Sequence, residues 1–192
     1  MSKRKNSTGG FTLVELAVVL IVMLVMFAVG MPSFLRAYSA YRLNNAAAGV
    51  AGVLQSTRFQ AIRLNTRVNC LIQQNSNGAT NVWADSNGDG IEQSTENQFL
   101  LSGVVTLVPA ANVPNIGNLA TAIGVSTLTA ISPTNGTATF DARGAVSPPG
   151  VYVLCVGYVA HPNAGARAVV LMPSGIIQTW STDAAGNWWQ IN

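Results

Sequence analysis

Charged side chains are scarce in this sequence, and so are the residues that most enzymes use for acid–base or metal chemistry. Of 192 residues, 9% are charged, one is histidine and two are cysteine. The lone His161 has no second imidazole for a metal site, and no Ser or Cys arrangement around it suggests a catalytic triad. The sequence also has no phosphate-binding glycine motif and no Cys/His cluster with zinc spacing. These absences predict a protein that is not an enzyme and requires no cofactor.

The excess positive charge is confined to the N-terminus. The formal net charge is +3, from ten basic and seven acidic residues. Three of the basic residues, Lys3, Arg4 and Lys5, precede the first apolar run, so the rest of the chain is neutral on its side chains. Positive residues beside a membrane span stay on the cytoplasmic side. The chain beyond the span is therefore expected in the periplasm or outside the cell.

A long apolar run follows these basic residues, and it contains one acid. The segment Gly-Gly-Phe-Thr-Leu-Val-Glu-Leu over residues 9–16 leads into apolar residues up to Leu35, broken only at Pro32 and Ser33. A span needs roughly 20 mainly apolar residues, and a charge within it costs about 2.5 kcal/mol or more. Glu15 therefore needs a partner. If the chain is cut after Gly10, the new α-amino group of Phe11 lies about one helical turn from Glu15.

These residues resemble the N-terminus of type IV pilins: a short basic leader, Gly, Phe, Thr-Leu-Val-Glu-Leu and a hydrophobic helix. The resemblance covers roughly the first 35 residues. It implies that a prepilin peptidase cuts after Gly10 and N-methylates Phe11, and that Glu15 guides docking into a helical filament. The implied partners are other pilins or pseudopilins, the peptidase, an inner-membrane assembly platform and the lipid bilayer. The implied location is the bacterial inner membrane, with one span, and then the filament.

Two simpler interpretations of the same segment remain open. An ordinary secretory signal would use Lys3, Arg4 and Lys5 as its basic region, and cleavage after Gly30 would leave Met31 as the first residue. Its apolar region usually runs only about 7 to 15 residues and has no use for a glutamate. A plain single-span anchor also leaves Glu15 unexplained. The N-terminal residue of the purified protein separates these alternatives.

Apolar spacing predicts one helix over residues 11–68, with a bend at Pro32. Pro32 is expected, like Glu15, to contribute to assembly. We expect a leader over 1–10, a transmembrane half over 11–35, an amphipathic half over 36–68 and a periplasmic head over 69–192. In the amphipathic half an apolar stripe recurs every three or four residues and is expected to bury against a sheet. Gly49 and Gly52 lie beside it. They serve close packing either against a neighbouring helix or against this sheet.

Beyond residue 68 the pattern changes to short β-branched and aromatic runs separated by turn residues. The predicted fold class is α+β, a long kinked N-terminal helix packed on an antiparallel β-sheet head. Strands are expected over 68–73, 80–84, 99–108, 137–141, 151–158, 166–172 and 176–181, with a last one over 188–191, and an irregular excursion over 109–135. This layout, with its Trp-Ala-Asp-Ser-Asn-Gly-Asp-Gly hairpin and a Phe-Asp-Ala-Arg-Gly segment over 140–144, looks like the GspH/FimT branch of minor pilins and pseudopilins. Members of that branch serve a type II secretion pseudopilus or type IV pili, and some contribute to DNA uptake.

The hairpin segment also matches the spacing of an EF-hand calcium loop. Asp85, Asn87 and Asp89 stand at alternate positions, a glycine follows, and Glu96 closes twelve residues. Against calcium, Glu92 occupies a position where an apolar residue usually stands, and strands are expected on both sides. Asn-Gly-Asp-Gly is also a strong hairpin turn by itself. Both interpretations stay open, with the turn favoured.

Cysteine, arginine and tryptophan provide three further predictions. In an oxidising compartment Cys70 and Cys155 are expected to form a disulfide, the alternative being two buried free thiols.

Arg58, Arg63 and Arg67 form a basic strip that would contact DNA phosphates without reading sequence, although the Gly-Arg-x-Arg tail associated with DNA-binding members of the branch is missing. A helix face that pairs with acids of neighbouring subunits is the favoured alternative. The tryptophans near the C-terminus either anchor a partner or pack the last strand: Trp180, Trp188 and Trp189.

Overall fold

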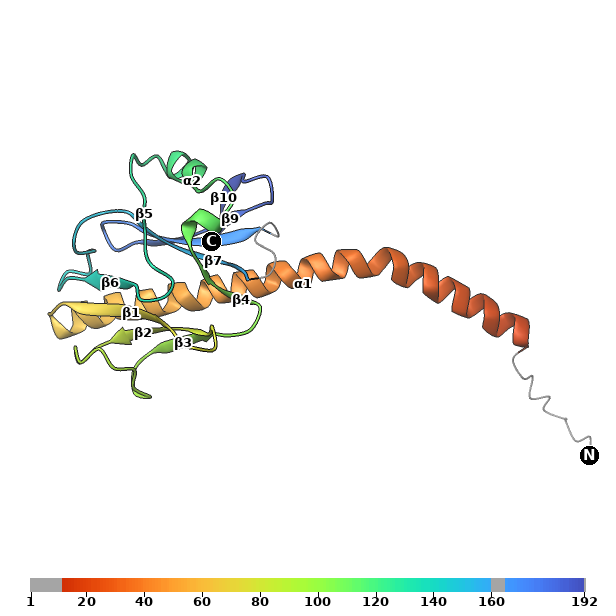
Figure 1. The fold of residues 1–192 in the computed structure, drawn as a ribbon, viewed down its shortest axis with the longest axis horizontal. Coiled ribbons are helices and arrows are strands. Elements are labelled where there is room, and N and C mark those ends of the chain that lie inside the picture. Colours follow the sequence, from red (N-terminus) through yellow and green to blue (C-terminus); the bar gives the residue numbers. More distant parts are fainter. Residues whose placement is uncertain (1–11, 160–164, 192) are drawn as a thin grey trace, which may run out of the picture. The chain divides into compact units, whose positions relative to one another are not determined.

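The computed structural model describes residues 12–159 and 165–191. Gly10, Phe11 and His161 lie outside these residues. The chain forms two units, Met1–Ala40 and Tyr41–Asn192. Helix α1 (Leu13–Leu64) runs from the first into the second (Figure 1), and Pro32 lies inside it without ending it. It is the one described helix long and apolar enough to cross a bilayer.

Helix α1 ends four residues before the predicted end at residue 68. Asn65 adopts the left-handed conformation, with φ of 51°, and the N–H of Thr66 donates to the carbonyl of Ala61. This six-to-one hydrogen bond with a left-handed residue is a common way to end a helix. Val68 is therefore the first residue of a strand, and Leu64 is exposed instead of joining the apolar stripe.

The head contains two sheets, which we call sheet A and sheet B. The strands are β1 Val68–Gln74, β2 Thr80–Asp85, β3 Gln98–Leu101, β4 Val105–Val108, β6 Thr137–Phe140, β7 Tyr152–Tyr158, β8 Ala166–Leu171, β9 Ile177–Thr182 and β10 Trp188–Ile191. Sheet A has the order β3-β2-β1-β6, and sheet B has the order β10-β9-β8-β7-β4. Every described strand pair is antiparallel except that of the short β5 (Thr129–Ala130), which lies parallel to β7. The predicted α+β fold is confirmed.

Two predicted segments differ from the structure. The single strand expected over 99–108 is wrong, because Gly103 turns the chain with φ of 88° and the two halves join different sheets as β3 and β4. The excursion over 109–135 is not wholly irregular. It contains the 3-10 turn η1 (Ala110–Asn112), helix α2 (Ile116–Ile123) and strand β5. Apolar residues such as Leu119 fix α2 against sheet B.

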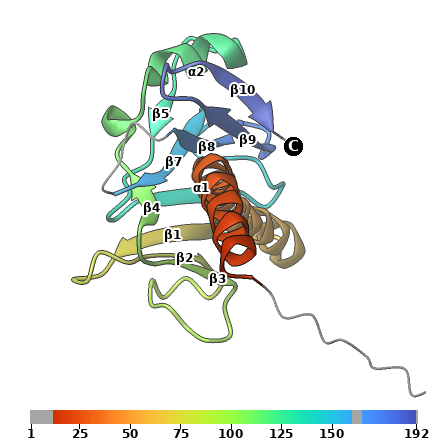
Figure 2. The same cartoon turned by 90° about the vertical axis from the view of Figure 1, so that its right-hand side faces the viewer.

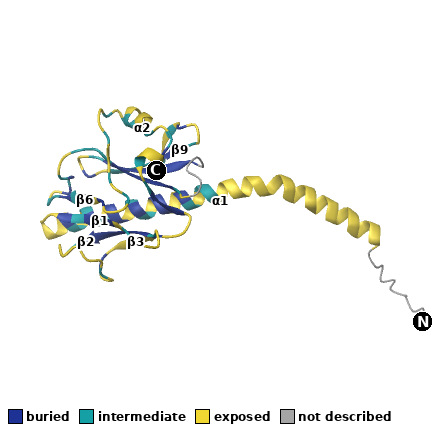
Figure 3. Cartoon of the chain, viewed as in Figure 1, coloured by how far each residue is buried: buried dark blue, intermediate teal, exposed yellow. Residues whose placement is uncertain are grey.

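The second half of α1 lies between the two sheets (Figure 2) and supplies the centre of the main core. Both sheets turn apolar side chains toward it, for example Val82 from sheet A and Leu154 from sheet B. Figure 3 shows the contrast along the helix, since residues 12–38 are exposed throughout. The buried helix residues are Leu43, Ala46, Ala47, Val50, Val53, Leu54, Thr57 and Ala61. The predicted burial of an amphipathic stripe against a sheet is confirmed.

The predicted disulfide is wrong, because Cys70 and Cys155 are both free and buried. Cys70 belongs to the core around α1, whereas Cys155 belongs to a second core on the opposite face of sheet B, under α2. Side chains alternate between the two faces of a strand, so Leu154 and Val156 face α1 while Cys155 faces away. Burial raises the pKa of both thiols to about 12.

Candidate functional site

The first turn of α1 holds Glu15, and Thr12 fixes this turn. The hydroxyl oxygen of Thr12 accepts a hydrogen bond from the N–H of Glu15 at 3.2 Å, and the Thr12 carbonyl accepts one from the N–H of Leu16. Thr12 is thus the helix cap, and the spacing Thr-x-x-Glu is that of a capping box. This spacing was readable in the sequence. It places an exposed carboxylate at the positive end of the helix dipole.

The head half of α1 has an exposed stripe opposite its buried one. Phe59 is 64% exposed, and a groove of about 400 Å³ runs beside it, lined by Gly52, Gln55, Ser56, Phe59, Gln60 and Arg63. The stripe recurs every three or four residues: Tyr41, Asn45, Ala48, Gly52, Gln55, Phe59 and Ile62. We call these seven residues the helix stripe. Its small and aromatic side chains suit the close approach of another helix.

Gly49 and Gly52, in the head half of α1, differ, and each fits one of the two interpretations given above. A Cβ atom on Gly49 would meet the ring of Phe99 on β3, so this glycine serves the helix-to-sheet contact. A Cβ atom on Gly52 would meet nothing within 4 Å. Gly52 therefore leaves room only on the outer side of the helix, where a neighbour would pack.

The predicted calcium residues form a hydrogen-bonded turn between β2 and β3. Asp85 accepts the N–H groups of Gly88 and Gly90, at 2.8 and 3.2 Å. Glu96 accepts those of Ser86 and Gln93, at 2.9 and 3.2 Å. Asp85 and Glu96 are 3% and 6% exposed. Gly88 and Gly90 have positive φ, of 78° and 72°, as the turn interpretation expects.

Asp89 does not join the other two carboxylates. It accepts hydrogen bonds from Asn87, Ile91 and Gln93 within the exposed part of the loop. Within residues 12–159 and 165–191, no three His, Cys, Asp or Glu side chains gather as a metal-ligating group. Calcium binding by Asp85, Asn87, Asp89 and Glu96 therefore stays a prediction, and its ligands would have to rearrange.

Replacing Glu96 with glutamine is expected to destabilise the head by about 1 to 3 kcal/mol. The buried carboxylate accepts two backbone N–H groups, and a neutral amide oxygen is a weaker acceptor with only one oxygen to offer. Glu92→Gln makes the same charge change at an exposed position of the loop and should leave stability nearly unchanged. Denaturant unfolding of the full-length chain in detergent, with and without calcium, measures both effects. A calcium-dependent rise in the wild-type midpoint that Asp85→Asn removes would instead establish the metal site.

The predicted arginine strip is divided by the structure. Arg58 donates from Nε to the carbonyl of Gly144 at 3.0 Å and reaches the carbonyl of Ser174 at 3.4 Å, so it braces two loops against α1. Arg63 and Arg67 are exposed. Arg167 is buried and donates from Nε to Asn44 Oδ1 at 2.6 Å, and burial lowers its pKa. Only part of the strip therefore faces solvent.

The C-terminal tryptophans divide between the two predicted roles. Trp180 is buried in the core under α2. Trp188 is half-buried, and its indole N–H donates to the carbonyl of Asn115 at 3.1 Å, which ties β10 to the segment before α2. Trp189 is 47% exposed. Core packing is thus right for the first two, and Trp189 is the one available to a partner.

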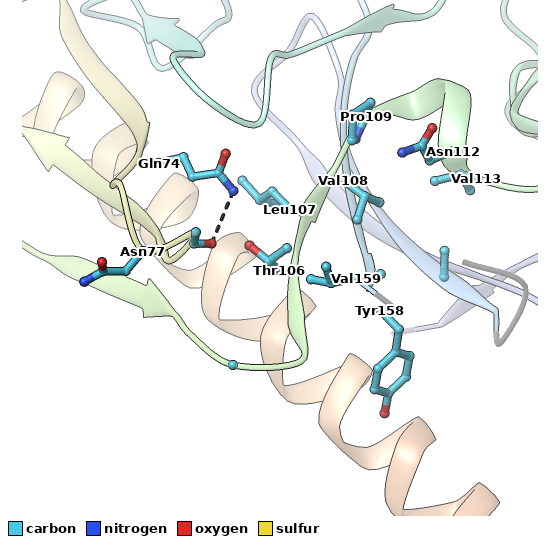
Figure 4. Close-up of a pocket in the computed structure, with 14 residues that line it drawn as sticks. Gln74, Asn77, Thr106, Leu107, Val108, Pro109, Asn112, Val113, Tyr158 and Val159 are labelled. Atoms are coloured by element: carbon cyan, nitrogen blue, oxygen red, sulfur yellow. Dashed lines mark hydrogen bonds between the residues drawn. The ribbon is translucent and has the colours of Figure 1, made fainter. Parts of the chain in front are cut away.

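A cleft of about 350 Å³ opens between the β1–β2 hairpin and strand β4 (Figure 4). Gln74 donates to the carbonyl of Gly78 at 3.2 Å, and Thr106 shares a hydrogen bond with Thr80. Tyr158 is its one titratable lining residue. Among the described residues, this cleft brings together no nucleophile with a base and no pair of carboxylates.

Comparison with known proteins places the chain in a family. A family model described as Type II transport protein GspH matches residues 46–175. The chain belongs to the GspH family. The match covers most of the head and most of the helix half that packs on it, while residues 1–45 lie before it and β9 and β10 lie after it. Pilin-like proteins of this family are structural, and they assemble with other pilins in a filament.

Two solved structures are similar to this GspH-family chain at low identity. Both are the type IV minor pilin FimU of Pseudomonas aeruginosa strain PAO1, in space groups P21 and P65. The first has 14% identity and a TM-score of 0.47, covering 76% of this chain and 92% of FimU. The second has 15% identity and a TM-score of 0.43, covering 74% and 94%. No curated protein sequence matches the chain.

Proposed function

We propose that the mature chain is a minor subunit of a type II secretion pseudopilus or a type IV pilus, cut after Gly10 and assembled through α1. The observation that supports this best is the contrast along that helix. Residues 12–38 bury no side chain within the chain, whereas from Leu43 onward the helix packs against both sheets. An apolar stretch of this kind is stable in lipid or against other helices.

Before assembly, the chain resides in the inner membrane with its N-terminus in the cytoplasm and its head in the periplasm. The three basic leader residues set this orientation. In the inner membrane, prepilin peptidase cuts the chain and the assembly platform binds it.

The mechanism of assembly depends on Glu15. In the bilayer its unpaired carboxylate costs about 2.5 to 3.5 kcal/mol. In the filament it pairs with the Phe11 amine of a neighbouring subunit, and docking recovers that cost. The helix stripe then packs on neighbouring helices, with Gly52 allowing close approach.

The experiment that tests the proposal determines the first residue of the purified protein. Expressed with prepilin peptidase, the chain should begin at N-methylated Phe11, and without the peptidase it should keep its leader. Gly10→Val should block the cut, whereas the matched Gly9→Val should not. Mass spectrometry and N-terminal sequencing measure both. A first residue of Met31 would identify a secretory signal and contradict the proposal.

DNA binding is a second candidate function, supported by the exposed Arg63, in the last turn of α1, and the exposed Arg67, three residues after the helix ends. If these side chains contact phosphates, replacing both with alanine should weaken duplex binding and reduce the salt slope by about 2. Arg143→Ala, at an exposed loop position, removes one positive charge away from α1 and is the control for the single variants Arg63→Ala and Arg67→Ala. Gel shift with the full-length chain in detergent, at several salt concentrations, gives the result. No salt-dependent binding by the wild type would remove this candidate.

A further inference from the structure

One buried arginine of the head has no counter-ion among the described residues. Arg167, the second residue of β8, is 8% exposed. Charged side chains are almost never buried to this degree unless an opposite charge pairs with them. Arg167 donates from Nε to Asn44 Oδ1 at 2.6 Å and from Nη1 to the carbonyl of Ala166 at 3.0 Å. Neither acceptor is a carboxylate, so these hydrogen bonds leave the positive charge uncompensated.

The neighbours of Arg167 within the head do not supply a negative charge. On the adjacent strands it is paired with Val156 of β7 and Ser181 of β9. Tyr158 has an electrostatic effect on it, but a phenol carries no charge at neutral pH. Burial is the larger influence, and it lowers the pKa of Arg167. The cost of burying this charge is therefore not recovered inside the chain.

The guanidinium of Arg167 still reaches the surface of the head. Its hydrogen-bond partner Asn44 is an exposed residue of α1. The terminal nitrogen Nη2 donates to no group in the described part of the chain, and it is not one of the polar atoms that are sealed inside the head without a partner. A guanidinium with free N–H groups can bind a carboxylate through two parallel hydrogen bonds. An acid from outside the chain can therefore approach it.

Ser181, beside Arg167, is a second polar group that the chain does not satisfy. Its Oγ is buried and has no hydrogen-bond partner in residues 12–159 and 165–191. Directly paired residues on adjacent strands share one face of a sheet, so Ser181 and Arg167 both lie on the face of sheet B that is turned toward α1. A charge and a hydroxyl group are thus left without full partners at the same place.

Two exposed aromatic side chains flank Arg167. Trp189 of β10 is paired with Ser181, so it lies on the same sheet face, two strands from Arg167, and is 47% exposed. Tyr41 stands one helical turn before Asn44 on α1 and is 62% exposed. Tryptophan, tyrosine and arginine are enriched at the energetic centres of protein interfaces. This surface therefore suits a protein partner better than a free anion.

The surface around Arg167 adjoins the helix stripe. Tyr41 belongs to both, and Asn44 directly precedes Asn45 of the stripe. A neighbouring subunit that packs on the helix stripe would therefore also reach Arg167. Because a minor subunit is present in few copies, this neighbour is a different pilin.

We propose that an aspartate or glutamate of a different pilin subunit pairs with Arg167 in the filament, with Trp189 and Tyr41 packing against the same subunit. This proposal rests on the proposed function, because the partner is a neighbour in the filament. Arg167 then gains its counter-ion only on assembly. Charge pairs across an interface determine which partner binds and in which orientation, so Arg167 would help to select the pilin that lies beside this subunit.

Replacing Arg167 with methionine separates a docking role from a structural one. Methionine is apolar and of similar length, and a buried charge without a partner is costly. The unfolding midpoint of the full-length chain in detergent should therefore stay unchanged or rise. Incorporation into filaments should fall on the order of tenfold or more, because the partner's carboxylate loses its pair. Arg167→Lys keeps the charge without the planar fork and should give an intermediate yield.

Two control variants accompany Arg167→Met. Arg143→Met removes the same charge from an exposed loop and should assemble as the wild type does. Asn44→Ala removes the hydrogen bond between α1 and Arg167 but keeps the charge, so it should also assemble. If Asn44→Ala lost as much incorporation as Arg167→Met, Arg167 would be a brace between α1 and β8, and the pairing would be wrong.

Photocross-linking identifies the partner. p-Benzoylphenylalanine replaces Trp189 in the full-length chain, which is expressed with its assembly machinery, and sheared filaments are irradiated. The expected adduct contains a different pilin, with an aspartate or glutamate in or next to the linked peptide. Replacing that acid with alanine should reduce incorporation as Arg167→Met does, and combining the two changes should add little further loss.

The outcomes distinguish this pairing from the proposed function. Wild-type incorporation of Arg167→Met would overturn the pairing while the subunit function stands. The same conclusion follows if residue 189 links only to lipid, only to a second copy of this chain, or to nothing in filaments that contain it. If even the wild type is absent from filaments, both proposals fail.

Discussion

Replacing Glu15 with alanine is expected to abolish incorporation into filaments while leaving the amount of chain in the membrane unchanged. Removing the carboxylate makes the first turn of α1 more compatible with lipid, so insertion should not suffer. Docking loses its ion pair with Phe11 of a neighbour. A difference of about 2.5 to 3.5 kcal/mol corresponds to a change on the order of a hundredfold in the docking equilibrium. Sheared filaments and membranes, separated and probed for the chain, give the two amounts.

Two control variants separate the charge of Glu15 from its other properties. Glu15→Gln keeps the size and the hydrogen-bonding capacity but removes the charge, so it should fail as Glu15→Ala does. Val19→Ala removes side-chain volume at an exposed position of the same helix and should assemble normally. Each variant is sequenced at its N-terminus to show that Phe11 is still the first residue. Wild-type incorporation of Glu15→Ala would contradict the docking mechanism.

Replacing Gly52 with leucine is expected to stabilise the isolated chain and yet to exclude it from filaments. Leucine favours a helix over glycine by up to about 1 kcal/mol, and a Cβ atom at position 52 meets nothing within the chain. In the filament the same side chain would fill the groove beside Phe59, where another helix approaches. Unfolding in detergent and the yield in sheared filaments measure the two opposite effects.

Gly117 provides the matched control for this experiment. It is also an exposed helical glycine with nothing within 4 Å of its Cβ position, but it lies on α2. Gly117→Leu should raise stability in the same way and leave assembly unaffected. If Gly52→Leu assembled as well as Gly117→Leu, the helix stripe would not be an assembly surface.

The local pattern of the sequence was enough to predict most of the elements. Alternating β-branched runs bounded by turn residues located β1, β2, β6, β7, β8, β9 and β10 within about two residues. Helical spacing identified the buried stripe of α1. Predictions failed where one glycine or asparagine decided the outcome. Asn65 ended the helix early, and Gly103 split one expected strand between two sheets. A local signal at such a residue does not reveal which sheet the next segment joins.

The candidate site shows the same limit. The Thr-x-x-Glu spacing at Thr12 and Glu15 was present in the sequence, because a helix cap depends on neighbouring residues alone. The roles of Arg58 and Arg167 could not be predicted from the sequence. Arg58 bonds to Gly144 and Arg167 bonds to Asn44, and in both cases the two residues are more than 80 positions apart in the sequence. Such contacts depend on the tertiary fold.

By itself, the sequence determined that this chain carries a long apolar helix with an acid near its start, three basic residues before that helix and a β-rich head. Those features follow from composition and spacing between neighbouring residues. Only the tertiary structure decided that Gly49 meets Phe99 while Gly52 faces outward, that Cys70 and Cys155 lie in separate cores, and that β3 and β10 end the sheets. The physical reason is that each of these depends on which face of an element meets another element, and residue spacing alone cannot specify that.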